Sequence, residues 1–176
     1  MASITNITAR FSIGKKINLQ KLHRKIDGSM LTDRGKSAFH RVKVTLTDPK
    51  CTALIYGNGK VILQGIRNEC HIQIIANSMA DIYNKDPPIC GIVNMAGQGH
   101  IGFRVDLGAF HEEVKKSPFK YLVYVPDDWH GLRVKLAEGT AIVFQTGSVK
   151  LTGVKSASQF EMLLDKIKSI AQSIKS

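Results

Sequence analysis

The chain repeats itself, and this internal repeat restricts the fold more than any other feature of the sequence. Residues 51–68 (CTALIYGNGKVILQGIRN) align with residues 139–156 (GTAIVFQTGSVKLTGVKS) at an offset of 88, and six of the 18 aligned positions are identical. The same offset relates three further blocks, including NITA at 6–9 and NMAG at 94–97. Four separated blocks with one offset indicate a tandem duplication, with repeats at 1–86 and 89–176 that together make one fold.

Both repeats predict the same series of elements and therefore an α+β fold. Each begins with a strand, at 4–11 and 92–96, followed by a helix whose apolar residues lie three and four positions apart. Asn18 and Asp106 precede these helices and are expected to cap them. The remaining predicted elements are strands at 42–46 and 132–136, hairpins at 52–65 and 140–153, and closing helices at 69–83 and 157–174.

The hairpins have two different faces because strand side chains alternate. One face is apolar in both repeats and is expected to pack beneath the helices; it holds Val61, Leu63, Val149 and Leu151. The other face mixes apolar and polar residues, and no helix is expected to cover it. This second face holds Ile62, Gln64, Lys150 and Thr152, opposite Leu54, Tyr56, Ile142 and Phe144. An uncovered, partly apolar sheet face predicts a binding surface.

The charge balance indicates the kind of partner. The chain carries 25 Lys and Arg against 14 Asp and Glu, a net charge of +11, which favours a polyanion such as nucleic acid. Residues 1–88 hold 14 basic and 6 acidic residues (+8), and residues 89–176 hold 11 and 8 (+3). No apolar run has the length of a membrane span, and no secretory leader is expected. The three cysteines lack the spacing of a disulfide framework or a zinc site.

No motif supports catalysis. Residues 97–102 read GQGHIG, which matches the glycine spacing of a dinucleotide-binding loop. The acidic residue required about 20 positions later is replaced by Leu122, so a turn is predicted here instead. No nucleophile, base and orienting group occur together, and the histidines lack ligand spacing. The chain is therefore expected to be neither an enzyme nor a protein that holds a cofactor or metal.

The hairpin segments, TALIYGNGKVILQG at 52–65 and TAIVFQTGSVKLTG at 140–153, resemble the paired hairpins of the TATA-box-binding protein family. Asn6 and Asn94, which open the repeats, and YVPDDWHG at 124–131 also resemble that family's pattern. The resemblance extends over the chain from about 4 to 174. It implies a saddle of two pseudo-symmetric halves, with a curved antiparallel sheet underneath and helices on the convex side.

The resemblance also implies which residues meet DNA in the minor groove. Asn6 and Asn94 would donate hydrogen bonds to groove acceptors, and Leu54, Ile62 and Ile142 would lie along the groove floor. Phe39 with Tyr56, and Trp129 with Phe144, would be wedges inserted between base steps. Further groove positions are Thr8, Gln64, Ala96, Lys150 and Thr152, and phosphate contacts are expected from Lys50, Lys60, Arg67, Lys135 and Lys155.

The implied function is to bind and bend A·T-rich promoter DNA at a TATA box and so nucleate a transcription pre-initiation complex. The implied partners are double-stranded DNA and transcription factors IIB and IIA. The implied location is the nucleus or, for a large DNA virus, the site of viral transcription. Whether the protein forms a homodimer in the absence of DNA is left undecided by the sequence.

Gln64 and Lys150 favour an alternative function, because they replace a threonine and an apolar residue expected on the groove face. This alternative is a divergent paralogue that recognises TATA weakly and acts mainly through protein partners. More distant alternatives are a module associated with an enzyme and a sheet that binds a small molecule.

Overall fold

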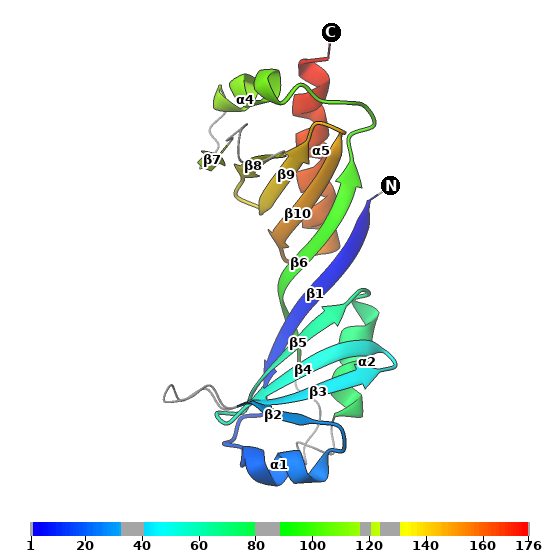
Figure 1. Ribbon diagram of the computed structural model, residues 1–176, viewed down its shortest axis with the longest axis vertical. Helices are drawn as coiled ribbons and strands as arrows, with labels where there is room; N and C mark the ends of the chain where they lie inside the picture. The colour runs from blue at the N-terminus through cyan, green and yellow to red at the C-terminus, as the bar shows by residue number, and fades with distance from the viewer. Residues whose placement is uncertain (1, 33–40, 80–88, 117–120, 124–130, 176) are drawn as a thin grey trace. The chain divides into compact units, whose positions relative to one another are not determined.

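The computed structural model describes residues 2–32, 41–79, 89–116, 121–123 and 131–175 of the chain. The chain divides into two compact units: Asn6–Val93 forms one, and Asn94–Ser176 together with Met1–Thr5 forms the other. Figure 1 shows the strands and helices of both. Residues 86–88, where the two repeats are predicted to join, lie outside the described residues, so this boundary stays a prediction.

The first repeat contains an antiparallel sheet covered by helices. Its strands follow the order β2-β3-β4-β5-β1 across the sheet. Helix α1 (Leu19–Lys25) contacts β2 and β3, and helix α2 (Cys70–Ser78) packs against β5. The strands are β1 (Ser3–Ser12), β2 (Met30–Thr32), β3 (Arg41–Thr47), β4 (Lys50–Tyr56) and β5 (Lys60–Ile66).

The second repeat has the same elements in the same chain order. Its antiparallel strands follow the order β6-β10-β9-β8-β7. Helix α5 (Ala157–Ser173) contacts β9 and β10, and helix α4 (Leu107–Lys115) contacts α5, β7 and β8. The strands are β6 (Gly91–His100), β7 (Tyr121–Val123), β8 (Gly131–Lys135), β9 (Thr140–Phe144) and β10 (Ser148–Val154).

The predicted α+β fold class is confirmed. The predicted hairpins correspond to β4–β5 and β9–β10, and the predicted closing helix at 157–174 corresponds to α5. Strands β2 and β7 were not predicted, because each has only three residues and too few positions for an alternating pattern. Helix α2 ends at Ser78, and residues 80–83 of the longer predicted helix lie outside the described part of the chain.

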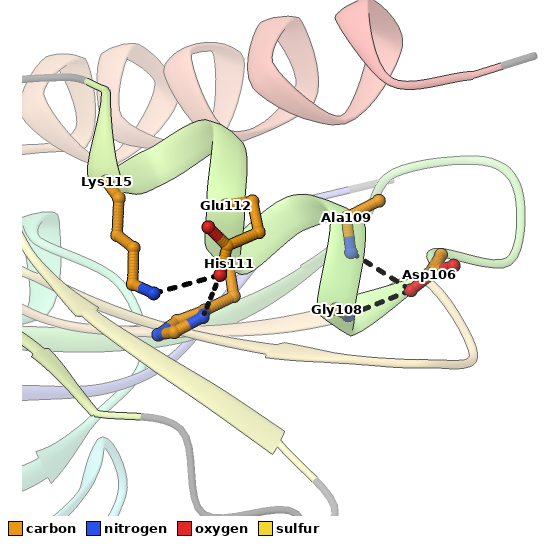
Figure 2. Close-up of polar contacts among 6 residues, drawn as sticks. All are labelled: Asp106, Gly108, Ala109, His111, Glu112 and Lys115. Atoms are coloured by element: carbon orange, nitrogen blue, oxygen red, sulfur yellow. Dashed lines mark hydrogen bonds and ion pairs between the residues drawn. The ribbon is translucent and has the colours of Figure 1, made fainter.

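The first helix of each repeat begins at the predicted cap. The Oδ1 atom of Asn18 accepts a hydrogen bond from the Lys21 N–H at 2.9 Å. Asp106 Oδ1 accepts from the N–H groups of Gly108 and Ala109, at 2.8 and 3.1 Å (Figure 2). Each cap satisfies donors that a helix N-terminus leaves unpaired and thereby defines where the chain turns from strand to helix.

Further along α4, the Glu112 carboxylate contacts both Lys115 and His111 (Figure 2). Its carboxylate accepts a hydrogen bond from Lys115 Nζ at 2.9 Å and lies 3.3 Å from His111 Nδ1. The hydrogen bond from Lys115 lowers the pKa of the Glu112 carboxyl. This pair is exposed and lies on the helix, so it adds a local surface contact rather than part of the core.

The core lies on one face of each sheet, where the helices pack. The four hairpin residues predicted to face the helices, Val61, Leu63, Val149 and Leu151, are at most 1% exposed. The helices contribute Ile75, Phe160 and Leu164, which are equally buried. Among the described residues no polar or charged side chain is buried, so hydrophobic burial holds the sheets and helices together.

The segment GQGHIG is not the predicted turn. Residues 97–100 form the end of strand β6, and only Gly102, with φ +109°, has the left-handed conformation typical of a turn glycine. Gly97 and Gly99 face α5 at close range. A Cβ atom on Gly97 would lie 2.5 Å from Phe160 Cε2, and one on Gly99 would lie 2.7 Å from Leu164 Cδ2. These glycines therefore allow the helix to approach the strand, which explains their spacing without a nucleotide.

This close approach predicts that Gly97→Ala destabilises the protein. The added methyl group would also meet the Ser3 carbonyl oxygen at 2.5 Å, so both the helix and the backbone must shift. Overpacking of this kind costs about 1–3 kcal/mol, which a lower midpoint of urea unfolding will report. Gly91→Ala, in the same strand with open space around its Cβ position, is the matched control. Equal midpoints for the two variants would contradict the packing argument.

Candidate nucleic-acid interface

The sheet face turned away from the helices is partly exposed in both repeats, and we call it the open face. Of the residues on it, Leu54 is only 7% exposed. In β6 the alternation is direct: Gly97 and Gly99 face α5, whereas Asn94, Ala96 and Gln98 face away. Every predicted groove residue that the structure describes lies on the open face: Asn6, Thr8, Leu54, Tyr56, Ile62 and Gln64 in the first repeat, and Asn94, Ala96, Ile142, Phe144, Lys150 and Thr152 in the second.

The asparagine that opens each repeat holds a bulge in the sheet. Between β1 and β5 the register shifts by one residue at Gly65, and between β6 and β10 it shifts at Gly153. These glycines have φ values of +85° and +87°, and an extra residue of this kind leaves its N–H outside the strand ladder. The Gly65 N–H donates to Asn6 Oδ1 at 2.8 Å, and the Gly153 N–H donates to Asn94 Oδ1 at 2.8 Å.

This hydrogen bond also fixes which way each amide points. Because Oδ1 accepts from the bulge, the Nδ2 group with its two donors is directed away from Gly65 or Gly153. Thr152 Oγ1 donates to the same oxygen of Asn94, at 3.4 Å. Both asparagines are half-buried on the open face, so a ligand lying there would meet amide donors already held in place.

An apolar floor lies beside each asparagine. In the first repeat Leu54 pairs with Ile62 across β4 and β5, and the two line a hollow of about 510 Å³ whose margin includes Arg41, Lys43 and Gln64. In the second repeat Ile142 pairs with Lys150 across β9 and β10 and lines a hollow of about 270 Å³ with Gln98 and Thr152. Each hollow therefore combines apolar contact with polar and cationic groups.

Charge is sorted between the two faces of the sheets. No described strand contains an Asp or a Glu; the described carboxylates lie in helices, caps and loops. All the cations within the described strands occupy positions that alternation places on the open face: Arg10, Arg41, Lys43, Lys50, Lys60, Arg133, Lys135 and Lys150. The open face is therefore positive in both repeats, and no carboxylate of its own strands neutralises it.

The predicted phosphate contacts lie at the ends of the strands. Lys50 and Lys60 begin β4 and β5, and Lys135 ends β8. Arg67 and Lys155 directly follow β5 and β10. All five side chains are exposed, and none of them lines either of the two hollows described above.

Only one member of each predicted wedge pair can be located. Tyr56 ends β4 and Phe144 ends β9, and both are half-buried on the open face. Their predicted partners, Phe39 and Trp129, lie outside the described residues. Lys150 Nζ lies 5.5 Å from the centroid of the Phe144 ring, within the range of a cation–π contact.

The described residues contain neither a candidate metal site nor a helix that could cross a membrane. No three of their His, Cys, Asp and Glu side chains gather as the ligands of a metal ion would. None of the described helices combines the length and the apolar character that crossing a bilayer demands.

The comparisons with known proteins agree with this geometry. The family model described as transcription factor TFIID, or TATA-binding protein (TBP), matches residues 1–85 and 90–174, which is nearly the whole chain. The chain belongs to the TATA-binding protein family. A solved TBP structure from Methanococcus jannaschii matches 98% of this chain and 98% of its own, with a TM-score of 0.79 and 21% sequence identity. This likeness confirms the predicted TBP-type fold.

Curated members of the family are similar over most of their length. TATA-box-binding protein 2 of Entamoeba histolytica is 27% identical over 90% of this chain and 75% of its own. TATA-box-binding protein E of Halobacterium salinarum is 26% identical, with 95% and 91% covered. The TBP-related factor of Drosophila melanogaster is 26% identical, with 98% and 77% covered. Relatives named for the TATA box and a relative named only as TBP-related thus match at the same level.

Sequence reasoning missed part of the positive surface. Arg10, Arg41, Lys43 and Arg133 lie on the open face but were not among the predicted contacts. The signal was present in the sequence, because each alternates with residues that belong to the apolar face, such as Val42 and Val44 around Lys43. The alternation in β3 and β8 was recognised, but these cations were not assigned to the face that also carries the groove residues of the hairpins.

The bulge hydrogen bond gives a prediction for Asn94. Asn94→Ala removes the acceptor of the Gly153 N–H and is expected to lower stability by about 0.5–1.5 kcal/mol. Asn94→Asp keeps an oxygen at the same position and is expected to remain near the wild-type stability. Urea unfolding of both variants measures the difference, and an equal loss in both would show that the side-chain oxygen does not support the bulge.

Proposed function

We propose that this protein binds double-stranded A·T-rich promoter DNA through the open face, bends it, and so nucleates a transcription pre-initiation complex. The observation that carries the proposal is the sorting of charge. Every strand cation of the described residues lies on the open face, and no strand carboxylate accompanies them. A surface of this kind attracts a polyanion, and its positive groups would release counterions from the phosphates.

The hydrogen-bonding groups on the open face favour recognition of the minor groove of the DNA. A·T pairs present only acceptors there, A N3 and T O2, so a protein that reads them must donate. Asn6 and Asn94 supply amide donors, because their oxygens are engaged by Gly65 and Gly153. The apolar floor formed by Leu54, Ile62 and Ile142 suits a groove that is recognised by its shape and deformability.

The half-buried rings support bending as well as binding. Tyr56 and Phe144 stand at the ends of β4 and β9, and we assign them to the two wedges that the family pattern pairs with Phe39 and Trp129. An apolar side chain inserted between base steps costs a few kcal/mol of unstacking, which a bent duplex offsets by meeting more protein surface. Lys50, Lys60, Arg67, Lys135 and Lys155 are assigned to the phosphates.

We propose protein partners and a cellular location as well. The protein would act with transcription factors of the IIB and IIA type, in the nucleus or at the site of viral transcription, and DNA would be its principal ligand. A second candidate function is a divergent paralogue that recognises TATA weakly and acts through protein partners. Lys150 and Gln64 favour it, because they make the open face more polar than a purely apolar groove floor.

Fluorescence transfer between the labelled ends of short duplexes tests the proposal. We expect tight binding and marked end-to-end shortening of a TATA-containing duplex, and weaker effects on a shuffled A·T-rich duplex and a G·C duplex of equal length. All three are compared at one near-physiological salt concentration, because phosphate contacts make affinity salt-dependent. Weak and unbent binding to all three would instead support the divergent paralogue.

The wedge assignment predicts a loss of bending in Phe144→Ala. Stacking of a base on an aromatic side chain is worth about 1–3 kcal/mol, so binding should weaken by roughly tenfold and the end-to-end distance should lengthen. The ring is half-buried on the open face rather than in the core, so the fold should persist. Gln145→Ala, an exposed neighbour, is the control, and a normal bend in Phe144→Ala would rule out this wedge.

A further inference from the structure

Equivalent rows of residues cross the open faces of the two repeats, and their charges are placed differently. In the first repeat the row runs Lys43, Leu54, Ile62 and Arg10 through β3, β4, β5 and β1. In the second it runs Arg133, Ile142, Lys150 and Gln98 through β8, β9, β10 and β6. Each row has two cations. In the first repeat the second cation is Arg10 in β1, whereas in the second repeat it is Lys150 in β10, and Gln98 takes the β6 position equivalent to Arg10.

This displacement puts Lys150 where the first repeat has its apolar floor. Neighbouring strands are about 4.8 Å apart, so Lys43 and Arg10 are separated by roughly 14 Å and bracket Leu54 and Ile62. Arg133 and Lys150 are separated by roughly 10 Å and bracket Ile142 alone. The first row therefore has cations at its margins, whereas the second has a cation inside it.

The described strands around Lys150 supply no anion. Its neighbours across the strands are Ile142 and Gln98, and its ammonium lies 5.5 Å from the centroid of the Phe144 ring. The described strands contain no carboxylate, and in the free protein the exposed ammonium is hydrated. A ligand that covers the second repeat removes this water, and a covered ammonium without an acceptor is strongly unfavourable.

We propose that Lys150 is a specificity-determining residue that requires minor-groove acceptors, and excludes a groove-facing amino group, in the half of the DNA site bound by the second repeat. The proposal rests on the proposed function, since it assumes that the open face meets the minor groove. A·T pairs offer only acceptors to the ammonium. A G·C pair adds the guanine N2 amino group, a donor that both displaces the ammonium and leaves it unpaired.

The same geometry makes the two halves of the site unequal. In the first repeat the equivalent position is Ile62. Its apolar side chain can lie against the minor groove but forms no hydrogen bond, so it requires no acceptor. Replacement of Lys150 should therefore alter the base preference in one half of the site and leave the other half unchanged. This local effect separates a base-reading lysine from one that only contributes positive charge.

Inosine–cytosine pairs provide the probe, because inosine lacks the guanine N2 amino group. The I·C pair keeps the major-groove edge and two of the three base-pairing hydrogen bonds. Single I·C or G·C pairs are introduced at each position of a TATA duplex, and the dissociation constants are measured at one salt concentration. At the pair contacted by Lys150, the wild type should prefer I·C over G·C by about tenfold. Lys150→Met, which keeps the chain length without the charge, should bring this ratio close to one at that position only.

Lys135→Met is the matched control, since it removes the same charge from the open face at the end of β8. It should weaken binding to all duplexes by a similar factor and leave every I·C to G·C ratio unchanged. An unaltered ratio in Lys150→Met, or an equal change in both halves of the site, would overturn the role of Lys150. If the wild type neither bends nor prefers the TATA duplex, the proposed function itself fails, which the bending measurement reports separately.

Discussion

The packing of helices on one face of each sheet is the constraint on which the rest of the structure depends. Helices pack on a single face of each sheet, so alternate strand residues must be apolar and the residues between them can vary. Leu63 and Leu151 occupy the buried face in the two repeats and are both essentially inaccessible to solvent. One position earlier, Ile62 and Lys150 occupy the open face and differ completely in chemistry. The fold can therefore carry a positive, ligand-specific surface without placing any charge in its core.

Glycine reinforces this division at two kinds of position. Gly97 and Gly99 bring α5 close to β6 on the buried face, where a methyl group would meet Phe160 or Leu164. Gly65 and Gly153 have positive φ and form bulges whose N–H groups are satisfied by asparagine side chains on the open face. The first pair makes the packing closer, and the second pair orients groups that a ligand would meet. The segment GQGHIG was wrongly predicted to be a turn. Gly97 and Gly99 are two positions apart, a spacing that also puts two glycines on the same face of a strand.

The parts of the molecule that could be predicted were those with a local pattern. Two copies of each pattern made the prediction stronger, which is why the hairpins, the Asn18 and Asp106 caps and the apolar faces were found. The bond from Gly65 to Asn6 joins residues 59 positions apart and depends on a register shift, and no local pattern encodes such a shift. Asn6 and Asn94 were identified by resemblance alone, and the structure adds the physical reason for their amide orientation. Arg10, Arg41, Lys43 and Arg133 were locally encoded but overlooked.

A duplicated fold can keep the same backbone structure in both repeats and still present two different surfaces. The repeats retain the residues that this backbone structure requires: the asparagine, the bulge glycine, and the valine and leucine of the buried hairpin face. They differ on the open face, where Ile62, Gln64 and Arg10 of the first repeat correspond to Lys150, Thr152 and Gln98 of the second. Equivalent backbone positions thus present unlike groups on the open faces of the two repeats. Since each side chain is supported by the same register, the difference between the halves arises from side-chain chemistry and not from a change of fold.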